Sequence, residues 1–111
     1  EQQCQQLYHS WGIRIPDINC SYLTSAVGVV YGTSQKLAIR KEILQAVSEQ
    51  YGVSVSAVDS GIRRMIDQLE AKPAEGWTQF KAESGFEAEK PTTGKLIYAI
   101  KRYLIQQKSR E

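Results

Sequence analysis

The sequence lacks any long hydrophobic run. No apolar stretch approaches the roughly 20 residues that a helix needs to cross a bilayer, and no signal-peptide pattern is visible at the start. The chain begins with Glu1 rather than Met, so we expect Glu1 to be a trimmed end that a further domain can precede. These absences lead us to expect a cytoplasmic protein that works away from membranes.

Cysteine and histidine are also scarce, which limits metal and catalytic chemistry. Cys4, Cys20 and the single His9 match neither a zinc spacing nor a dense disulfide framework, and together they lack a fourth ligand for a structural zinc site. One histidine leaves no credible Ser-His-Asp or Cys-His set, and no phosphate-binding loop occurs. We expect a reduced protein with no metal, no cofactor and no enzymatic activity.

Excess charge of either sign is small, because the formal net charge is only +2. Its distribution is uneven: residues 90–111 hold six basic residues and one acid, whereas the rest of the chain holds eight basic and eleven acidic residues. A basic last helix can simply complement its own macrodipole. It can also present a cationic surface to a partner, and the sequence leaves both interpretations open.

What is present is a helical pattern along the whole chain. Apolar residues recur at three- and four-residue steps, which is typical of helices buried on one face. We predict one all-α domain spanning residues 1–111, with about six helices near 2–11, 17–32, 36–51, 55–71, 74–84 and 92–108. Residues 13–16 should be extended, because a residue before proline avoids the helical region.

Small polar residues mark the expected helix starts. Thr33 or Ser34 is placed to cap the third helix, which can also be two short helices with a bend near Ile39. Ser54 is placed to cap the helix at 55–71, and Thr92 or Thr93 is placed to cap the last helix. Gly12, Gly52 and Gly85 are expected to end helices, since a helix C-cap favours a residue in the left-handed region.

The segments around Gly52 predict a helix-turn-helix, in which two helices meet across a short turn that contains glycine. Ser48 provides a small residue four positions before Gly52, where the second helix crosses closely. Val53 is expected to fill the angle after the turn, and Val58 and Ile62 are expected to be buried on the second helix.

The outward face of that second helix carries the candidate DNA contacts, because the N-terminal part of a recognition helix contacts base edges in the major groove. Its residues are Ser54, Ser56, Ala57, Asp59, Ser60, Arg63 and Arg64. Arginine can bind guanine through two hydrogen bonds, Asp59 can accept from cytosine, and small residues allow a close approach. The same residues also suit a solvated face, on which Asp59 and Asp67 pair with the arginines.

The stretch "ILQAVSEQYGVSVSAVDSGIRRMI" resembles the helix-turn-helix of the C-terminal output domain of the stage 0 sporulation protein A family. The likeness extends over nearly the whole chain. "YHSWGIRIPDINCSYLTSAVGVVY" resembles the family's first two helices, with a Gly-x-x-x-Pro link and a Tyr-Leu pair. "EKPTTGKLIYAIKRYL" resembles the Lys-Pro-Thr segment that leads into the family's last helix.

The resemblance implies an all-α response-regulator output domain of about six helices that binds a short double-stranded DNA box. Members bind tandem boxes as dimers once a phosphorylated receiver domain releases the output domain, and they contact an RNA polymerase sigma factor. By position the recognition helix is residues 55–71. Arg63 matches a family arginine, and Lys90 and Thr92 match the segment that approaches the phosphate backbone.

Four positions depart from the family pattern. The family has arginines where this chain has Ala57 and Ser60, glutamate at Asp59 and histidine at Arg64. The alternative to a DNA-binding domain is therefore a protein-interaction module that kept the fold and lost the DNA contacts. The two differ in whether Ser56, Arg63, Lys90 and Lys95 converge on one positively charged face.

Overall fold

The computed structural model describes residues 2–13 and 17–110, and every secondary-structure element in these ranges is a helix. The elements are α1 (Gln2–Ser10), α2 (Ile18–Tyr31), a π-helical turn η1 (Ile39–Leu44), α3 (Gln45–Tyr51), α4 (Val55–Ala71), α5 (Glu75–Ser84) and α6 (Thr93–Arg110). The all-α class and the six α-helices agree with the sequence prediction. No helix in these ranges is long and apolar enough to cross a membrane.

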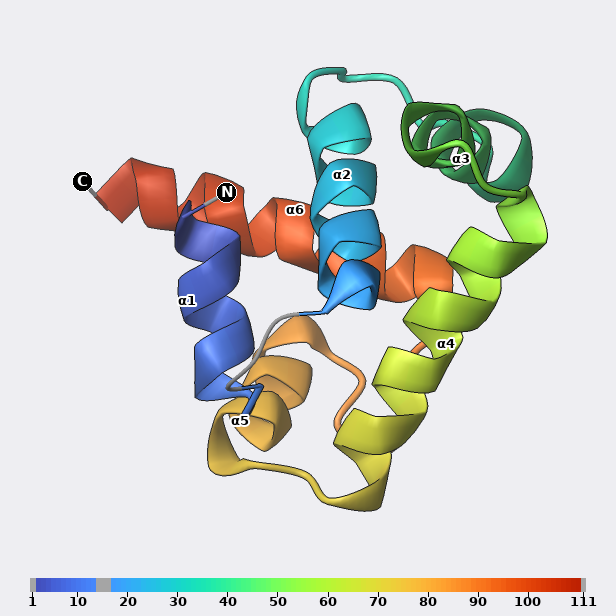
Figure 1. The fold of residues 1–111 in the computed structure, drawn as a ribbon. Helices are drawn as coiled ribbons and strands as arrows, with labels where there is room; N and C mark the ends of the chain where they lie inside the picture. The colour runs from blue at the N-terminus through green and yellow to red at the C-terminus, as the bar shows by residue number, and fades with distance from the viewer. Residues whose placement is uncertain (1, 14–16, 111) are drawn as a thin grey trace.

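Helix α2 is the centre of the fold. It packs against α3, α4 and α6, while α1 packs against α5. Figure 1 shows α6 crossing α2, with α3 and α4 to one side and α1 and α5 to the other. On α2, Leu23, Ala26 and Val30 are completely buried, and burying a side chain as large as Leu or Val contributes about 1.5–3 kcal/mol.

A cluster of aromatic side chains joins Trp11, the residue directly after α1, to α5. The rings of Trp11 and Trp77 meet edge to face, with their centroids 4.8 Å apart, and Phe80 lies 5.0 Å from Trp11. Tryptophan and phenylalanine bury more area than any aliphatic side chain. This cluster therefore holds the first and fifth helices together although they are more than sixty residues apart in the sequence.

Most of the expected helix ends are confirmed. Gly12, Gly52 and Gly85 all adopt positive φ values. The Ser54 hydroxyl accepts a hydrogen bond from the N–H of Ala57, and the Thr92 hydroxyl accepts one from the N–H of Lys95. Of the segment 13–16 that was expected to be extended, residues 14–16 lie outside the described residues.

The start of the third helix differs from the prediction. Residues 36–38 are not helical, the helix begins at Ile39 as a π-turn, and neither Thr33 nor Ser34 caps it. Two contacts with α6 accompany this difference: the Tyr98 hydroxyl accepts from the N–H of Leu37 at 3.0 Å, and Lys101 donates to the carbonyl of Thr33 at 2.9 Å. The Glu42 carboxylate also accepts from the N–H of Ala38 at 2.8 Å. These bonds hold residues 33–38 in a non-helical conformation.

Glu70 links α4 to α5. Its Oε2 accepts from the indole N–H of Trp77 at 2.9 Å and from the ammonium group of Lys81 at 2.8 Å, and the Lys81 side chain is only 9% exposed. Burial alone would raise the pKa of the Glu70 carboxyl, but the hydrogen bonds from Lys81 and Trp77 outweigh burial and hold that pKa below its ordinary value.

The low pKa of Glu70 predicts an acid-dependent loss of stability. A carboxyl whose pKa is lower in the folded state stabilises the fold above its unfolded-state pKa, and this contribution disappears as the pH falls through the folded-state pKa. We expect Glu70→Gln to lower the free energy of unfolding at neutral pH, and the difference from the original protein to shrink below about pH 4. Urea unfolding at several pH values measures this difference in the free energy of unfolding. The exposed Glu83→Gln is the control, and equal behaviour of the two variants would contradict the role of Glu70.

Helix α5 approaches α1 so closely that Gly76 has no room for a side chain. A Cβ at this position would lie 2.1 Å from the backbone oxygen of Ser10. We expect Gly76→Ala to lower the free energy of unfolding by about 1–3 kcal/mol, because the added methyl group overpacks against backbone. Urea unfolding followed by circular dichroism measures this.

Gly28→Ala is the matched control for Gly76→Ala. A Cβ at Gly28, within α2, meets nothing within 4 Å. Alanine should therefore be neutral there, or stabilising by up to about 1 kcal/mol. Equal stability of the two variants would show that α1 and α5 do not pack this closely.

Candidate nucleic-acid interface

The α3–α4 pair is joined by a short turn that fixes the start of α4. Gly52 adopts the left-handed conformation, with φ 67° and ψ 33°, and Val53 donates its N–H to the carbonyl of Ser48 at 3.1 Å. Ser48 is 5% exposed, while Val58 and Ile62 are completely buried. The burial expected at these positions is confirmed.

One side of α4 is exposed along its whole length. Its buried residues form a stripe that faces α2 and α6. On the opposite side, Ser56, Ala57, Ser60, Arg63 and Arg64 are all exposed to solvent. Ser54 is exposed as well, although its hydroxyl already accepts the capping hydrogen bond from Ala57. These six residues lie where the sequence analysis placed them.

Asp59 does not belong to this exposed face, which corrects the sequence prediction. It is only 9% exposed. Its Oδ1 accepts from the Thr93 hydroxyl at 3.2 Å, and its Oδ2 lies 3.3 Å from Nη1 of Arg40 and 3.3 Å from Nε of Arg63. Its position directly after Val58 puts it at the edge of the buried stripe, where η1 and α6 approach α4. Both oxygens of its carboxylate are therefore already engaged by other residues of the protein.

Arg40 and Arg63 extend from Asp59 toward solvent. Their side chains are 58% and 70% exposed, respectively. A guanidinium group has five N–H donors, so the contact with Asp59 leaves most of each group free to bind a second anion. Asp59 thus fixes the orientation of two arginines from different elements without enclosing them.

The segment before α6 lies next to Arg63. Arg63, Ile66, Lys90, Pro91, Thr92 and Thr93 line a hollow of about 230 Å³. Lys90 also forms an ion pair with Asp67, one helical turn after Arg63. Arg63, Lys90 and Thr92, which come from two separate parts of the sequence, therefore border the same surface.

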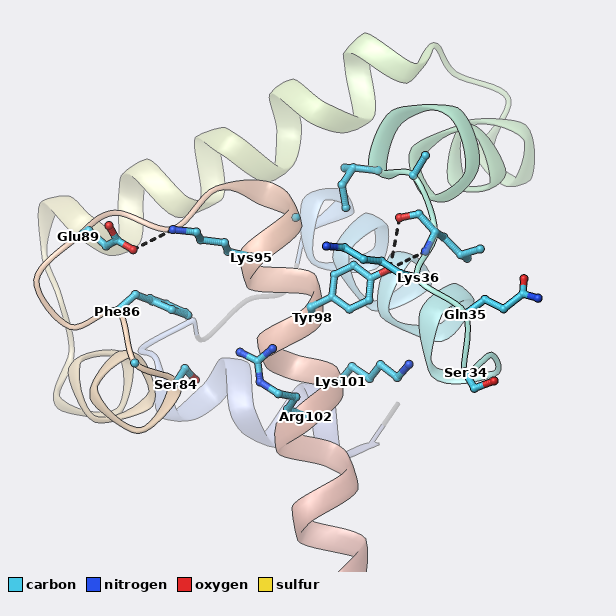
Figure 2. Close-up of a pocket in the computed structure, with 15 residues that line it drawn as sticks. Ser34, Gln35, Lys36, Ser84, Phe86, Glu89, Lys95, Tyr98, Lys101 and Arg102 are labelled. Atoms are coloured by element: carbon cyan, nitrogen blue, oxygen red, sulfur yellow. Dashed lines mark hydrogen bonds and ion pairs between the residues drawn. The ribbon is translucent and has the colours of Figure 1, made fainter.

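Lys95 lies elsewhere. Its ammonium group pairs with Glu89 at 2.9 Å, and it lines a different hollow, together with Tyr98 and Arg102 (Figure 2). Of the four residues whose convergence distinguishes a DNA-binding domain from a protein-interaction module, Arg63 and Lys90 share a hollow and Ser56 is exposed on the same helix as Arg63, whereas Lys95 is separate.

Acidic partners offset much of the positive charge on this surface. Arg40 and Arg63 share Asp59, and Lys90 is paired with Asp67. No such partner is within salt-bridge distance of Arg64 in the described part of the chain. Four cations and two acids leave this surface moderately positive. Lys90 and Asp67 are both more than half exposed, and such pairs are weak enough for a phosphate to replace one partner.

Sequence reasoning missed Arg40 and Thr93. Arg40 lies nineteen positions before Asp59, so no helical spacing connects the two. Thr93 was considered only as a cap, a role that Thr92 fills. Within the described ranges, no group of three His, Cys, Asp or Glu side chains could hold a metal ion.

Comparisons of this chain with protein-family models, with curated proteins and with solved structures found no match.

Removing the Asp59 carboxylate should destabilise the fold. We expect Asp59→Ala to lower the free energy of unfolding by about 1–3 kcal/mol more than Asp67→Ala, because only Asp59 satisfies a buried hydroxyl and orients two arginines. Both changes replace an aspartate by alanine on α4, so the difference in helix propensity cancels. Urea unfolding of the two variants measures the difference, and a smaller effect at Asp59 than at Asp67 would contradict its role.

Proposed function

We propose that this chain is a sequence-specific double-stranded DNA-binding domain of a transcriptional regulator, in which α3, the Gly52 turn and α4 form a helix-turn-helix. In this proposal α4 lies in the major groove. The observation that carries it is the exposed face of α4, where small residues are followed by Arg63 and Arg64 and flanked by Lys90 and Thr92.

The order of residues along α4 supports this orientation. Ser56, Ala57 and Ser60 are short, so the first turns of the helix can approach base edges closely. Arg63 and Arg64 follow one turn later, and their long side chains can contact guanine or phosphate. The opposite side of α4 is buried against α2 and α6, so the helix presents this face as a rigid unit.

A row of cations beside this face is suited to the DNA backbone. Asp59, Arg63 and Asp67 are spaced four residues apart on one edge of α4. Arg40 pairs with Asp59 and Lys90 pairs with Asp67, so both cations lie beside Arg63 along this edge. In this proposal Arg40, Lys90 and Thr92 contact phosphates, while Arg63 contacts a base. Asp59 orients Arg40 and Arg63 and does not contact DNA itself.

The family resemblance extends the proposal. An output domain of the stage 0 sporulation protein A type would bind tandem sites as a dimer, respond to a phosphorylated receiver domain and contact a sigma factor. Ala57 and Ser60 stand where that family has arginines, so we propose that this chain recognises a different DNA sequence or binds its site with lower affinity.

A protein-interaction module is the second candidate. The observation that favours it is the pairing of Arg40, Arg63 and Lys90 with acids, which lowers the net charge of the surface. A face of small polar residues would also suit a helix that docks on another protein.

Arg63 is the residue with which to test DNA binding. A duplex is first chosen by selection from a random-sequence library, and affinity is then measured by fluorescence anisotropy across a salt series, with a scrambled duplex for comparison. We expect Arg63→Ala to remove about 1–3 kcal/mol of discrimination if Arg63 contacts a base. Loss of a phosphate contact would instead reduce the salt slope by about one.

The exposed Lys108→Ala on α6 is the matched control, since it removes a cation away from α4. It should leave discrimination unchanged. Failure of the selection to enrich any sequence, together with no duplex binding at low salt, would reject DNA binding and favour the protein-interaction module.

The same assay tests the resemblance through Ala57 and Ser60. The double variant Ala57→Arg with Ser60→Arg places arginines where the family has them, and both positions are exposed. We expect it to bind the family's DNA box more tightly than the original chain does. Unchanged binding to that box would contradict the assignment of α4 as a recognition helix of this family.

A further inference from the structure

A large hollow lies on a different surface from the exposed face of α4. It has a volume of about 810 Å³ and opens between residues 34–39, the α5–α6 connection and the first half of α6. This volume is within the range of known ligand sites. Figure 2 shows Lys36, Lys95, Lys101 and Arg102 arranged around Tyr98 in this hollow, which we call the α6 groove.

The α6 groove combines an apolar lining with a cationic rim. Leu37, Ile39 and Tyr98 contribute apolar surface, to which the nearly buried Phe86 adds little. The charged lining residues are Lys36, Lys95, Lys101, Arg102 and the single acid Glu89. Glu89 neutralises Lys95.

Three of the rim cations have no acid beside them. In the part of the chain that the structure describes, no carboxylate is within salt-bridge distance of Lys36, Lys101 or Arg102. Lys101 donates to the carbonyl of Thr33, which leaves its charge uncompensated. The groove is therefore complementary to a ligand that carries several negative charges and apolar groups together.

The wall of the α6 groove is already in place. The Tyr98 hydroxyl bonds to the backbone of Leu37, and Lys101 bonds to that of Thr33, so residues 33–37 are fixed against α6. A site formed in advance avoids the free-energy cost of ordering its walls when a ligand binds.

We propose that the α6 groove binds an extended acidic peptide segment of a partner protein, in which glutamate or aspartate side chains alternate with apolar ones. The acidic side chains would pair with Lys36, Lys101 and Arg102, and the apolar ones would cover Leu37 and Tyr98. An open groove fits an extended chain better than a compact ligand. The proposal does not depend on DNA binding by α4.

Nucleic acid fits the α6 groove less well. Its phosphates could pair with the cations but would leave the apolar lining uncovered. Single strands are bound by stacking of bases on exposed aromatic rings, whereas Phe86 is only 6% exposed and the Tyr98 hydroxyl is tied to Leu37. Lys95 and Arg102 also lie on the side of α6 opposite Thr93. Because Thr93 contacts Asp59 on α4, these two cations are not continuous with the surface beside α4.

A synthetic peptide tests the proposal directly. The probe is a short fluorescein-labelled peptide with glutamates flanking leucine and phenylalanine, and the comparison peptide has glutamine in place of glutamate. Anisotropy should show binding of the acidic peptide and at least about tenfold weaker binding of the glutamine peptide. Amide NMR shifts of the ¹⁵N-labelled protein should change at Leu37, Phe86 and Tyr98.

Charge reversal on the rim provides the matched variants. Lys36→Glu with Arg102→Glu should weaken peptide binding at least about tenfold, whereas Lys72→Glu with Lys108→Glu, which changes net charge equally outside the α6 groove, should change it less than about twofold. All four substituted residues are exposed, and thermal unfolding verifies that both variants fold.

The proposal is overturned by the absence of peptide binding at low salt, by NMR shifts confined to another surface, or by equal weakening of peptide binding in the two double variants. Duplex DNA added as a competitor separates the two surfaces. We expect it to leave the peptide bound. Displacement of the peptide by duplex, together with loss of duplex binding in Lys36→Glu with Arg102→Glu, would identify the α6 groove as a nucleic-acid surface instead. Absence of duplex binding in the original chain would reject the function proposed for α4 and leave the peptide result unaffected.

Discussion

The carboxylate of Asp59 is the contact on which the arrangement of the candidate interface depends. It is nearly buried, and it joins η1, α4 and α6 through Arg40, Arg63 and Thr93. A buried charge without partners would be very unfavourable, so the three elements must remain close enough to supply them. The guanidinium groups that satisfy Asp59 are themselves more than half exposed. One buried acid therefore both constrains the packing of the helices and determines where two surface cations lie.

Helix α6 shapes two surfaces at once. At its start, Thr93 faces Asp59 and Thr92 borders the hollow that contains Arg63. One to two turns later, Tyr98 and Lys101 hold residues 33–37 away from helical geometry and so form one wall of the α6 groove. The apolar residues between them, including Leu96, Ile97 and Ile100, are completely buried. The buried side of α6 anchors the helix in the core. A shift of α6 at the surface beside α4 would therefore also disturb the α6 groove, and the core packing resists both.

The sequence predicts features that depend on local chemistry and misses those that depend on distant partners. Helical periodicity located the helices, and Gly52, Ser54 and Thr92 marked their ends because caps involve residues close in sequence. Residues 36–38 were expected to be helical. The Glu42 carboxylate accepts from the N–H of Ala38, and the contacts at Thr33 and Leu37 come from α6, more than sixty positions later. Asp59 was placed outward together with the other polar residues at the start of this helix. Its burial follows from Arg40 and Thr93, neither of which shares a helix with it.

The ion pairs beside α4 affect the proposed DNA binding, and the size of the effect depends on how exposed each pair is. A pair whose members are both exposed gains little from its Coulomb attraction, because water and salt screen it. Separating Lys90 from Asp67 to admit a phosphate would therefore cost little. Arg40 and Arg63 need not leave Asp59 at all, since each has further N–H donors directed to solvent. Pairing thus lowers the long-range attraction of this surface for DNA without blocking short-range contacts. A domain of this kind would depend on the fit of α4 in the groove more than on charge, and a face with Ala57 and Ser60 in place of arginines is consistent with that balance.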